Sequence, residues 1–178
     1  MVTIYTIGHS NRELADFSRV LQAHEIRLLV DVRAFPVSRR YPHFNRSYLE
    51  LWLPEIGTGY VWEKDLGGRR DAQMPPEQSP NPALTEPAFR NYADYMLSQP
   101  FQKAADRLAE RAQKENTAIM CAEYSYLNCH RQLVSDYFLT LGHKVLHIGD
   151  DNEPTEHTLS ESARIIDGQL VYRGDYLF

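Results

Sequence analysis

The sequence has little cysteine, no long apolar run and no excess of positive charge, and each shortage excludes a class of protein. Its 178 residues contain two cysteines, too few for the disulfide framework of a small secreted domain. Runs such as Arg27–Val32 and Ala118–Cys121 have the length of a strand, far short of the roughly twenty residues that cross a bilayer. We therefore expect a cytoplasmic protein with free thiols and no membrane partner.

The charge is negative overall but unevenly distributed. A net charge of −5 disfavours nucleic acid as a partner, because non-specific binding depends on a positive surface that displaces counterions from phosphates. No acidic residue interrupts the stretch that carries Arg33, Arg39, Arg40 and Arg46, whereas the segment from Asp150 to Glu161 is acidic. This asymmetry favours a small anionic ligand. Alternatively, these arginines cap helices and pair with surface carboxylates, each pair contributing at most about 1 kcal/mol.

The order of apolar segments predicts a single α/β domain over residues 1–178. Five segments have the composition of strands, namely Val2–Ile7, Arg27–Val32, Tyr60–Trp62, Thr117–Cys121 and Lys144–Ile148. Helices are predicted from about Ser10 to Ala23 and over Ser47–Ile56, Glu86–Leu97, Phe101–Lys114 and Cys129–Leu141. This alternation predicts a mostly parallel sheet with helices on both faces.

Three shorter signals add detail to this fold. Ser10 and Glu13 have the spacing of a capping box at a helix start. The Asp-Gly pair within Ile165–Val171 is typical of a two-residue turn, so we expect a C-terminal β-hairpin. Prolines and aromatic residues predict an ordered functional loop over Arg33–Asn45, and residues 71–82, with four prolines, are expected to form an exposed loop or flap.

Reactive side chains follow the predicted strands at the same end. In open α/β sheets, ligands bind beyond the carboxyl ends of the strands. We therefore expect one pocket lined by His9, Asp31, Arg33, Glu123, Cys129 and Arg131. Asp31 is the clearest anomaly, because an unpaired carboxylate at the end of a buried strand is costly. Its partner is expected to be Arg33, His9 or Arg131.

Five ordered motifs resemble a known family. They are Thr6-Ile7-Gly8-His9-Ser10-Asn11, Val30-Asp31-Val32-Arg33-Ala34-Phe35-Pro36, Ser38-Arg39-Arg40 with Pro42-His43-Phe44-Asn45, Leu66-Gly67-Gly68-Arg69, and Cys121-Ala122-Glu123 through Cys129-His130-Arg131. Together they resemble the bacterial and archaeal family called domain of unknown function 488. The resemblance implies an α/β fold and no established activity. Tyr124–Asn128 departs from the more acidic, proline-containing link expected there.

Cys129 is the candidate reactive group. At a helix start beside His130 and Arg131, its pKa is expected to be low, which favours a thiolate, and the same backbone N–H groups would also bind an oxyanion. A small buried cysteine at a helix start is the alternative. Cys121, Cys129, His130 and His9, with Glu123 nearby, also offer ligands that zinc prefers. Their spacing matches no zinc motif, so the sequence alone assigns no metal and identifies no cofactor.

Two functions remain open on these residues. The first is an enzyme for a small phosphorylated or nucleotide-like substrate, with Cys129, His130, Asp31 and Glu123 as catalytic residues. Substrate contacts would come from His9, Ser10, Arg33, Arg39, Arg40, Asn45, Arg69 and Arg131. The second is a module that binds a nucleotide or single-stranded nucleic acid by stacking and phosphate contacts, without turnover. A purely structural domain would leave the gathered polar residues unexplained.

Overall fold

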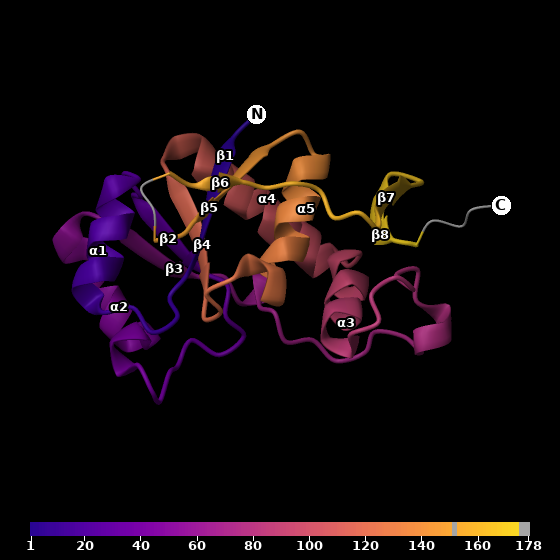
Figure 1. The fold of residues 1–178 in the computed structure, drawn as a ribbon, viewed down its shortest axis with the longest axis horizontal. Helices are drawn as coiled ribbons and strands as arrows, with labels where there is room; N and C mark the ends of the chain where they lie inside the picture. Colours follow the sequence, from indigo (N-terminus) through magenta and orange to yellow (C-terminus); the bar gives the residue numbers. More distant parts are fainter. Residues whose placement is uncertain (151–152, 175–178) are drawn as a thin grey trace.

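A six-stranded sheet forms the centre of the protein. The computed structural model describes residues 1–150 and 153–174. The strand order is β3-β2-β4-β1-β5-β6, and Figure 1 shows the sheet between helices on its two sides. The strands are β1 (Thr3–Gly8), β2 (Leu28–Asp31), β3 (Gly59–Trp62), β4 (Thr117–Cys121), β5 (Lys144–Ile148) and β6 (Thr155–Glu156). Only β6 is antiparallel to its neighbour. The predicted mostly parallel α/β sheet is confirmed.

Helices cover both faces of this sheet. They are α1 (Leu14–Ala23), α2 (Arg46–Trp52), α3 (Pro87–Met96), α4 (Gln99–Lys114) and α5 (Arg131–Thr140). Single 3-10 turns occur at η1 (Pro42–Phe44), η2 (Leu53–Ile56), η3 (Lys64–Leu66), η4 (Pro76–Gln78) and η5 (Tyr126–Asn128). No helix among the described residues is long and apolar enough to cross a membrane.

Alternation along the strands divides the core into two halves. Side chains such as Val30 and Ile119 pack in the cluster that includes residues of α3, α4 and α5. Their neighbours Leu29 and Met120 pack in the cluster that includes residues of α1 and α2. Successive residues of a strand point to opposite faces. Each central strand is therefore a continuous apolar run, because both of its faces are buried.

The C-terminal hairpin forms as predicted. Strands β7 (Ala163–Ile166) and β8 (Gln169–Tyr172) pair antiparallel. Asp167 and Gly168 both have positive φ, as the tight hairpin turn requires. The hairpin is tied to the loop predicted over residues 71–82: most of that loop is exposed, but Asn81 is buried and its side chain accepts a hydrogen bond from the Tyr172 amide.

Two helices, α1 and α5, begin at least two residues later than predicted. Helix α1 begins at Leu14, and no side chain caps it at Glu13, so the predicted capping box does not form. The reason is that β1 and β4 stay paired beyond their ends: the amides of His9 and Ser10 donate to Cys121 and Ala122. Helix α5 begins at Arg131, so Cys129 is extended backbone just before it.

The sheet contains a topological switch point between β1 and β4. These strands are neighbours, but the helices that follow them lie on opposite faces, since α1 contributes to one core cluster and α5 to the other. Such a division opens a crevice at the carboxyl ends of the two strands, where α/β proteins bind ligands. This position is marked by His9, which follows β1, and Ala122, which follows β4.

A buried ion pair terminates β2. Asp31 is fully buried, and both its carboxylate oxygens accept bonds from Arg33, at 2.9 Å to Nε and 2.5 Å to Nη2. The Tyr60 hydroxyl donates to the same carboxylate at 2.6 Å. Of the three partners expected for Asp31, Arg33 is therefore the one that forms the ion pair. The pair holds the Arg33–Asn45 loop against the sheet, because Arg33 Nη2 also donates to the Phe44 carbonyl.

We predict that Asp31→Ala lowers the free energy of unfolding by about 3–5 kcal/mol, because it leaves the Arg33 charge buried without its partner. Urea denaturation measures the effect. Asp16→Ala is the matched control: Asp16 pairs with Arg19 across 3.7 Å on an exposed surface, and its loss is expected to cost less than about 1 kcal/mol. Equal effects from the two variants would contradict this role for Asp31.

Candidate functional site

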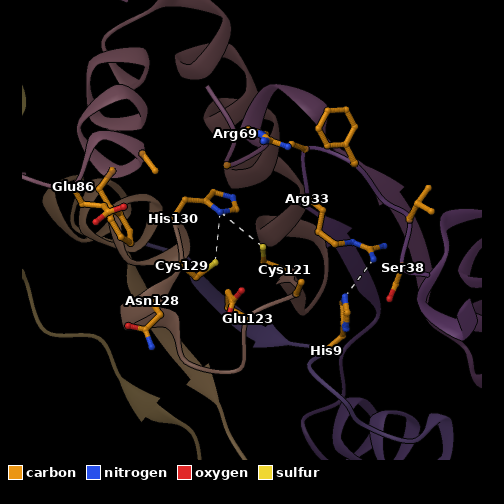
Figure 2. Close-up of a pocket in the computed structure, with 17 residues that line it drawn as sticks. His9, Arg33, Ser38, Arg69, Glu86, Cys121, Glu123, Asn128, Cys129 and His130 are labelled. Atoms are coloured by element: carbon orange, nitrogen blue, oxygen red, sulfur yellow. Dashed lines mark hydrogen bonds between the residues drawn. The ribbon is translucent and has the colours of Figure 1, made fainter. Parts of the chain in front are cut away.

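A cavity of about 630 Å³ lies at the switch point. Figure 2 shows the side chains that surround it, with His9 and Arg33 on one side and Cys129 and His130 on the other. Of the residues predicted to act on a substrate, six line the cavity: His9, Arg33, Arg69, Glu123, Cys129 and His130. The remaining six do not: Ser10, Asp31, Arg39, Arg40, Asn45 and Arg131.

Each of these six side chains is placed outside the cavity by a local cause. Asp31 is enclosed by its ion pair, and Asn45 accepts a bond from the Ser38 amide, which closes the loop. The Ser10 hydroxyl donates to Asn11. Arg39 and Arg40 are exposed on the loop beyond the rim, and Arg131 is buried behind Cys129. The expected single pocket therefore forms without Asp31 and Arg131.

Several residues that line the cavity were not predicted to belong to the site. Glu86 comes from the start of α3, and Phe89 from its first turn. Phe35, at the rim, is 68% exposed. Glu86 and Phe89 were missed because they are separated in sequence from the strand ends and only the packing of α3 against the sheet brings them to the site. Phe35 could have been found, since it belongs to the predicted functional loop.

His9 is a neutral residue in the lining of the cavity. It is buried, and burial lowers its pKa to about 4. Its Nδ1 donates to the Ser10 carbonyl at 2.9 Å, and its Nε2 then accepts from Arg33 Nη1 at 3.3 Å. Both ring nitrogens are therefore occupied. His9 fixes the orientation of Arg33 and has no nitrogen left for a ligand.

Two cysteines and one histidine meet on the other side of the cavity. Cys121 ends β4, and Cys129 and His130 precede α5. His130 Nδ1 lies 3.5 Å from Cys129 Sγ and 3.9 Å from Cys121 Sγ (Figure 2). Both thiols are free, so the cysteines are close without forming a disulfide.

The two thiols differ in acidity because they interact. A hydrogen bond from Cys121 lowers the pKa of Cys129, His130 and Arg131 lower it further, and burial opposes them. The pKa of Cys121 rises, first because its thiol donates that bond and then because it is buried. The low pKa predicted for Cys129 thus has Cys121 as its largest cause, a contact that the sequence did not reveal.

Arg131 holds the loop that connects the two cysteines. Its side chain is 1% exposed, and Nη2 donates to the carbonyls of Glu123 and Tyr124 at 2.5 and 3.2 Å. Its Nε donates to Cys129 Sγ at 3.5 Å. The expectation that Arg131 binds an anionic substrate does not fit this arrangement, because its donors point to the protein itself.

A buried chain of hydrogen bonds extends from Arg131 into the C-terminal part of the protein. Arg131 Nη1 donates to Thr6 Oγ1 at 3.3 Å, and the hydroxyl lies 2.7 Å from His147 Nδ1. His147 Nε2 lies 2.9 Å from His157 Nδ1, and His157 Nε2 lies 2.9 Å from Asp136. Burial lowers the pKa of His147 to about 3, so this ring is neutral and accepts from Thr6.

The same chain also supports the site loop by stacking. The ring of Tyr126, in η5, lies flat on His147 with centroids 3.5 Å apart. Tyr126 belongs to the segment Tyr124–Asn128, which departs from the expected proline-containing link. In this chain an aromatic contact therefore helps to hold the segment in place.

Gly68 provides the space that His130 occupies. A Cβ atom at this position would lie 2.3 Å from His130 Nδ1, far inside contact distance. Gly67 similarly approaches the Ala34 backbone. The Leu66-Gly67-Gly68-Arg69 motif thus brings backbone against the imidazole and directs the next residue, Arg69, to the cavity.

The comparisons with known proteins identify a family and nothing more specific. Residues 13–138, about seven tenths of the chain, match the family model described as Domain of unknown function DUF488. No curated protein matches the chain, and no solved structure matches it.

We predict that Gly68→Ala displaces the His130 ring, because the added methyl group would overlap it. The side-chain nitrogen resonances of His130 in a ¹H–¹⁵N correlation spectrum should shift. Gly149→Ala is the control, since its Cβ would meet only the Tyr124 hydroxyl, at 3.7 Å. An unchanged His130 signal in folded Gly68→Ala would show that the imidazole does not depend on this glycine.

Proposed function

We propose that this chain, which belongs to the DUF488 family, is an enzyme that acts on a small phosphorylated or nucleotide-like substrate in the cytoplasm. The observation that carries the proposal is that one cavity brings together the Cys121, Cys129 and His130 cluster, an arginine that forms no ion pair among the described residues, and two carboxylates. The reaction depends on Cys129 and takes place where the cluster meets the cavity.

The cavity suits a substrate with an anionic end and a flat body. Arg69 is exposed and forms no ion pair among the described residues, so it is the anion contact, whereas the charge of Arg33 is largely balanced by Asp31. Phe35 and Phe89 provide aromatic surface, and 630 Å³ is within the usual range for small-molecule sites.

The carboxylates favour a substrate that also carries N–H or O–H groups. Glu86 and Glu123 both line the cavity and accept hydrogen bonds when ionised. A wholly anionic molecule would be repelled by them. A nucleotide satisfies both requirements, since its phosphate faces Arg69 and its base and sugar offer donors. Glu123, next to the cluster in the chain, is the candidate for proton transfer.

The loop that carries Phe35 also supports a second candidate, a binding module without turnover. Phe35 is 68% and Val37 66% exposed, and Arg39 and Arg40 follow them on the same loop. Exposed aromatic and guanidinium groups bind nucleotides by stacking and phosphate contacts. Unlike the enzyme, such a module makes no use of the thiols at the far side of the cavity.

We predict that Cys129→Ser reduces turnover by more than about a thousandfold, because the reacting centre loses its sulfur. The assay incubates the full chain with a panel of nucleoside and sugar phosphates and follows substrate loss by mass spectrometry. Arg69→Ala should raise KM about tenfold or more, while Arg19→Ala, far from the cavity, leaves it unchanged.

Binding measured by calorimetry separates the two candidates. A ligand from the panel that binds equally well to the wild-type protein and to Cys129→Ser, and that neither protein converts, would favour the binding module over the enzyme.

A further inference from the structure

We propose that Cys121, Cys129 and His130 bind a zinc ion whose open coordination position faces the cavity. The inference deepens the proposed function, on which it rests for the substrate, by assigning the sulfurs the role of metal ligands. The three donor atoms, two Sγ and the Nδ1 of His130, all lie within 4.8 Å of one another. They come from the end of β4 and the start of α5, which the sheet brings together.

The distances fit a tetrahedral zinc ion. Zinc lies about 2.3 Å from thiolate sulfur and about 2.0–2.1 Å from imidazole nitrogen, so a sulfur and a nitrogen bound to one ion are about 3.6 Å apart. His130 Nδ1 lies 3.5 and 3.9 Å from the two sulfurs. One ion between the three atoms would satisfy all of them.

The surroundings of the cluster are built to hold these atoms in place. Arg131 Nε donates to Cys129 Sγ, as the partners of metal-bound sulfurs commonly do. Gly68 lies against His130 Nδ1 in a gap that leaves no room for a side chain, and the ring packs on Tyr92. Two thiolates and a neutral imidazole would together balance the charge of the zinc ion.

The ligand number indicates a catalytic rather than a structural site. Structural zinc sites close with four protein ligands, whereas catalytic sites use three and leave one position for water or substrate. Only three candidate ligands gather here among the described residues, and all three line the cavity. Zinc there would supply a bound water that ionises near neutral pH, and Glu123 lines the same space.

The other buried histidines do not offer such a site. Both nitrogens of His9 are occupied by Ser10 and Arg33. The nitrogens of His147 and His157 are likewise used in the chain that ends at Asp136. His130 differs from all of them, because its Nε2 has no hydrogen-bond partner among the described residues and its Nδ1 faces two sulfurs.

Cobalt binding to the full chain tests the proposal. The protein is stripped with a chelator, kept reduced with a phosphine and titrated with Co²⁺, whose thiolate charge-transfer and tetrahedral d–d absorption report the ligands. We expect one equivalent to bind with both bands and Zn²⁺ to displace it. Cys121→Ser and Cys129→Ser should each weaken binding by more than about a hundredfold, while His24→Ala, at the end of α1 and outside the cavity lining, binds as the wild type does.

Protection from alkylation provides a second measurement that needs no variant. Zn²⁺ should slow iodoacetamide labelling of Cys121 and Cys129 together, and a chelator should restore it. Absence of the charge-transfer band in the wild-type protein, or wild-type cobalt affinity in either serine variant, would overturn the proposal. Full turnover by the metal-free protein would also overturn it, while leaving the proposed function intact with Cys129 as a free nucleophile. Metal binding without turnover of any substrate would support the zinc site and contradict the proposed function.

Discussion

The buried guanidinium of Arg131 is the interaction on which the site depends. It holds the carbonyls of Glu123 and Tyr124 and the sulfur of Cys129, so both ends of the loop after β4 are fixed by one side chain. A buried cation without partners would be strongly destabilising. The loop therefore has little freedom to move away from Arg131, and the positions of Cys121 and Cys129 relative to each other follow from this constraint.

The site combines two walls of different character. On the β2 side, Asp31 neutralises Arg33, and His9 is held neutral by burial, so this wall is polar but carries little net charge. On the β4 side, two sulfurs and an imidazole face the cavity with one nearby cation, Arg131, behind them. Among the described residues that line the cavity, the charged side chains outside ion pairs are those of Arg69, Glu86 and Glu123. In the proposed function, Arg69 and Glu86 would bind the substrate while the reaction takes place at Cys129.

The sequence was sufficient for the fold and for part of the site. Apolar runs identified the parallel strands, and Asp31 was recognised as a buried carboxylate because its position at a strand end is unusual. The direction of a side chain was not predictable from the sequence. Arg131 was expected to face a ligand, but its N–H groups donate to backbone carbonyls. Those carbonyls reach Arg131 only in the folded loop. Glu86 was missed because α3 is brought to the site by packing, and no local pattern records that contact.

The insertion of β4 between β2 and β1 was also beyond the sequence pattern. Strand order depends on long-range contacts, since Thr117 pairs with residues of both β1 and β2, more than eighty residues earlier. This insertion is what places Cys121 beside His9 and creates the switch point.

The chain from Arg131 through Thr6, His147 and His157 to Asp136 has a consequence for how the protein opens. His147 and His157 lie outside residues 13–138, the part that matches the family, yet they are joined to the site by consecutive buried hydrogen bonds. Proteins open locally in cooperative units, and we expect these buried hydrogen bonds to join the two segments into one such unit. The amides of the loop after β4, of β5 and of the segment around His157 would then exchange together and slowly. In that case the segment around His157 would contribute to the local stability of a site built mainly from residues that precede it.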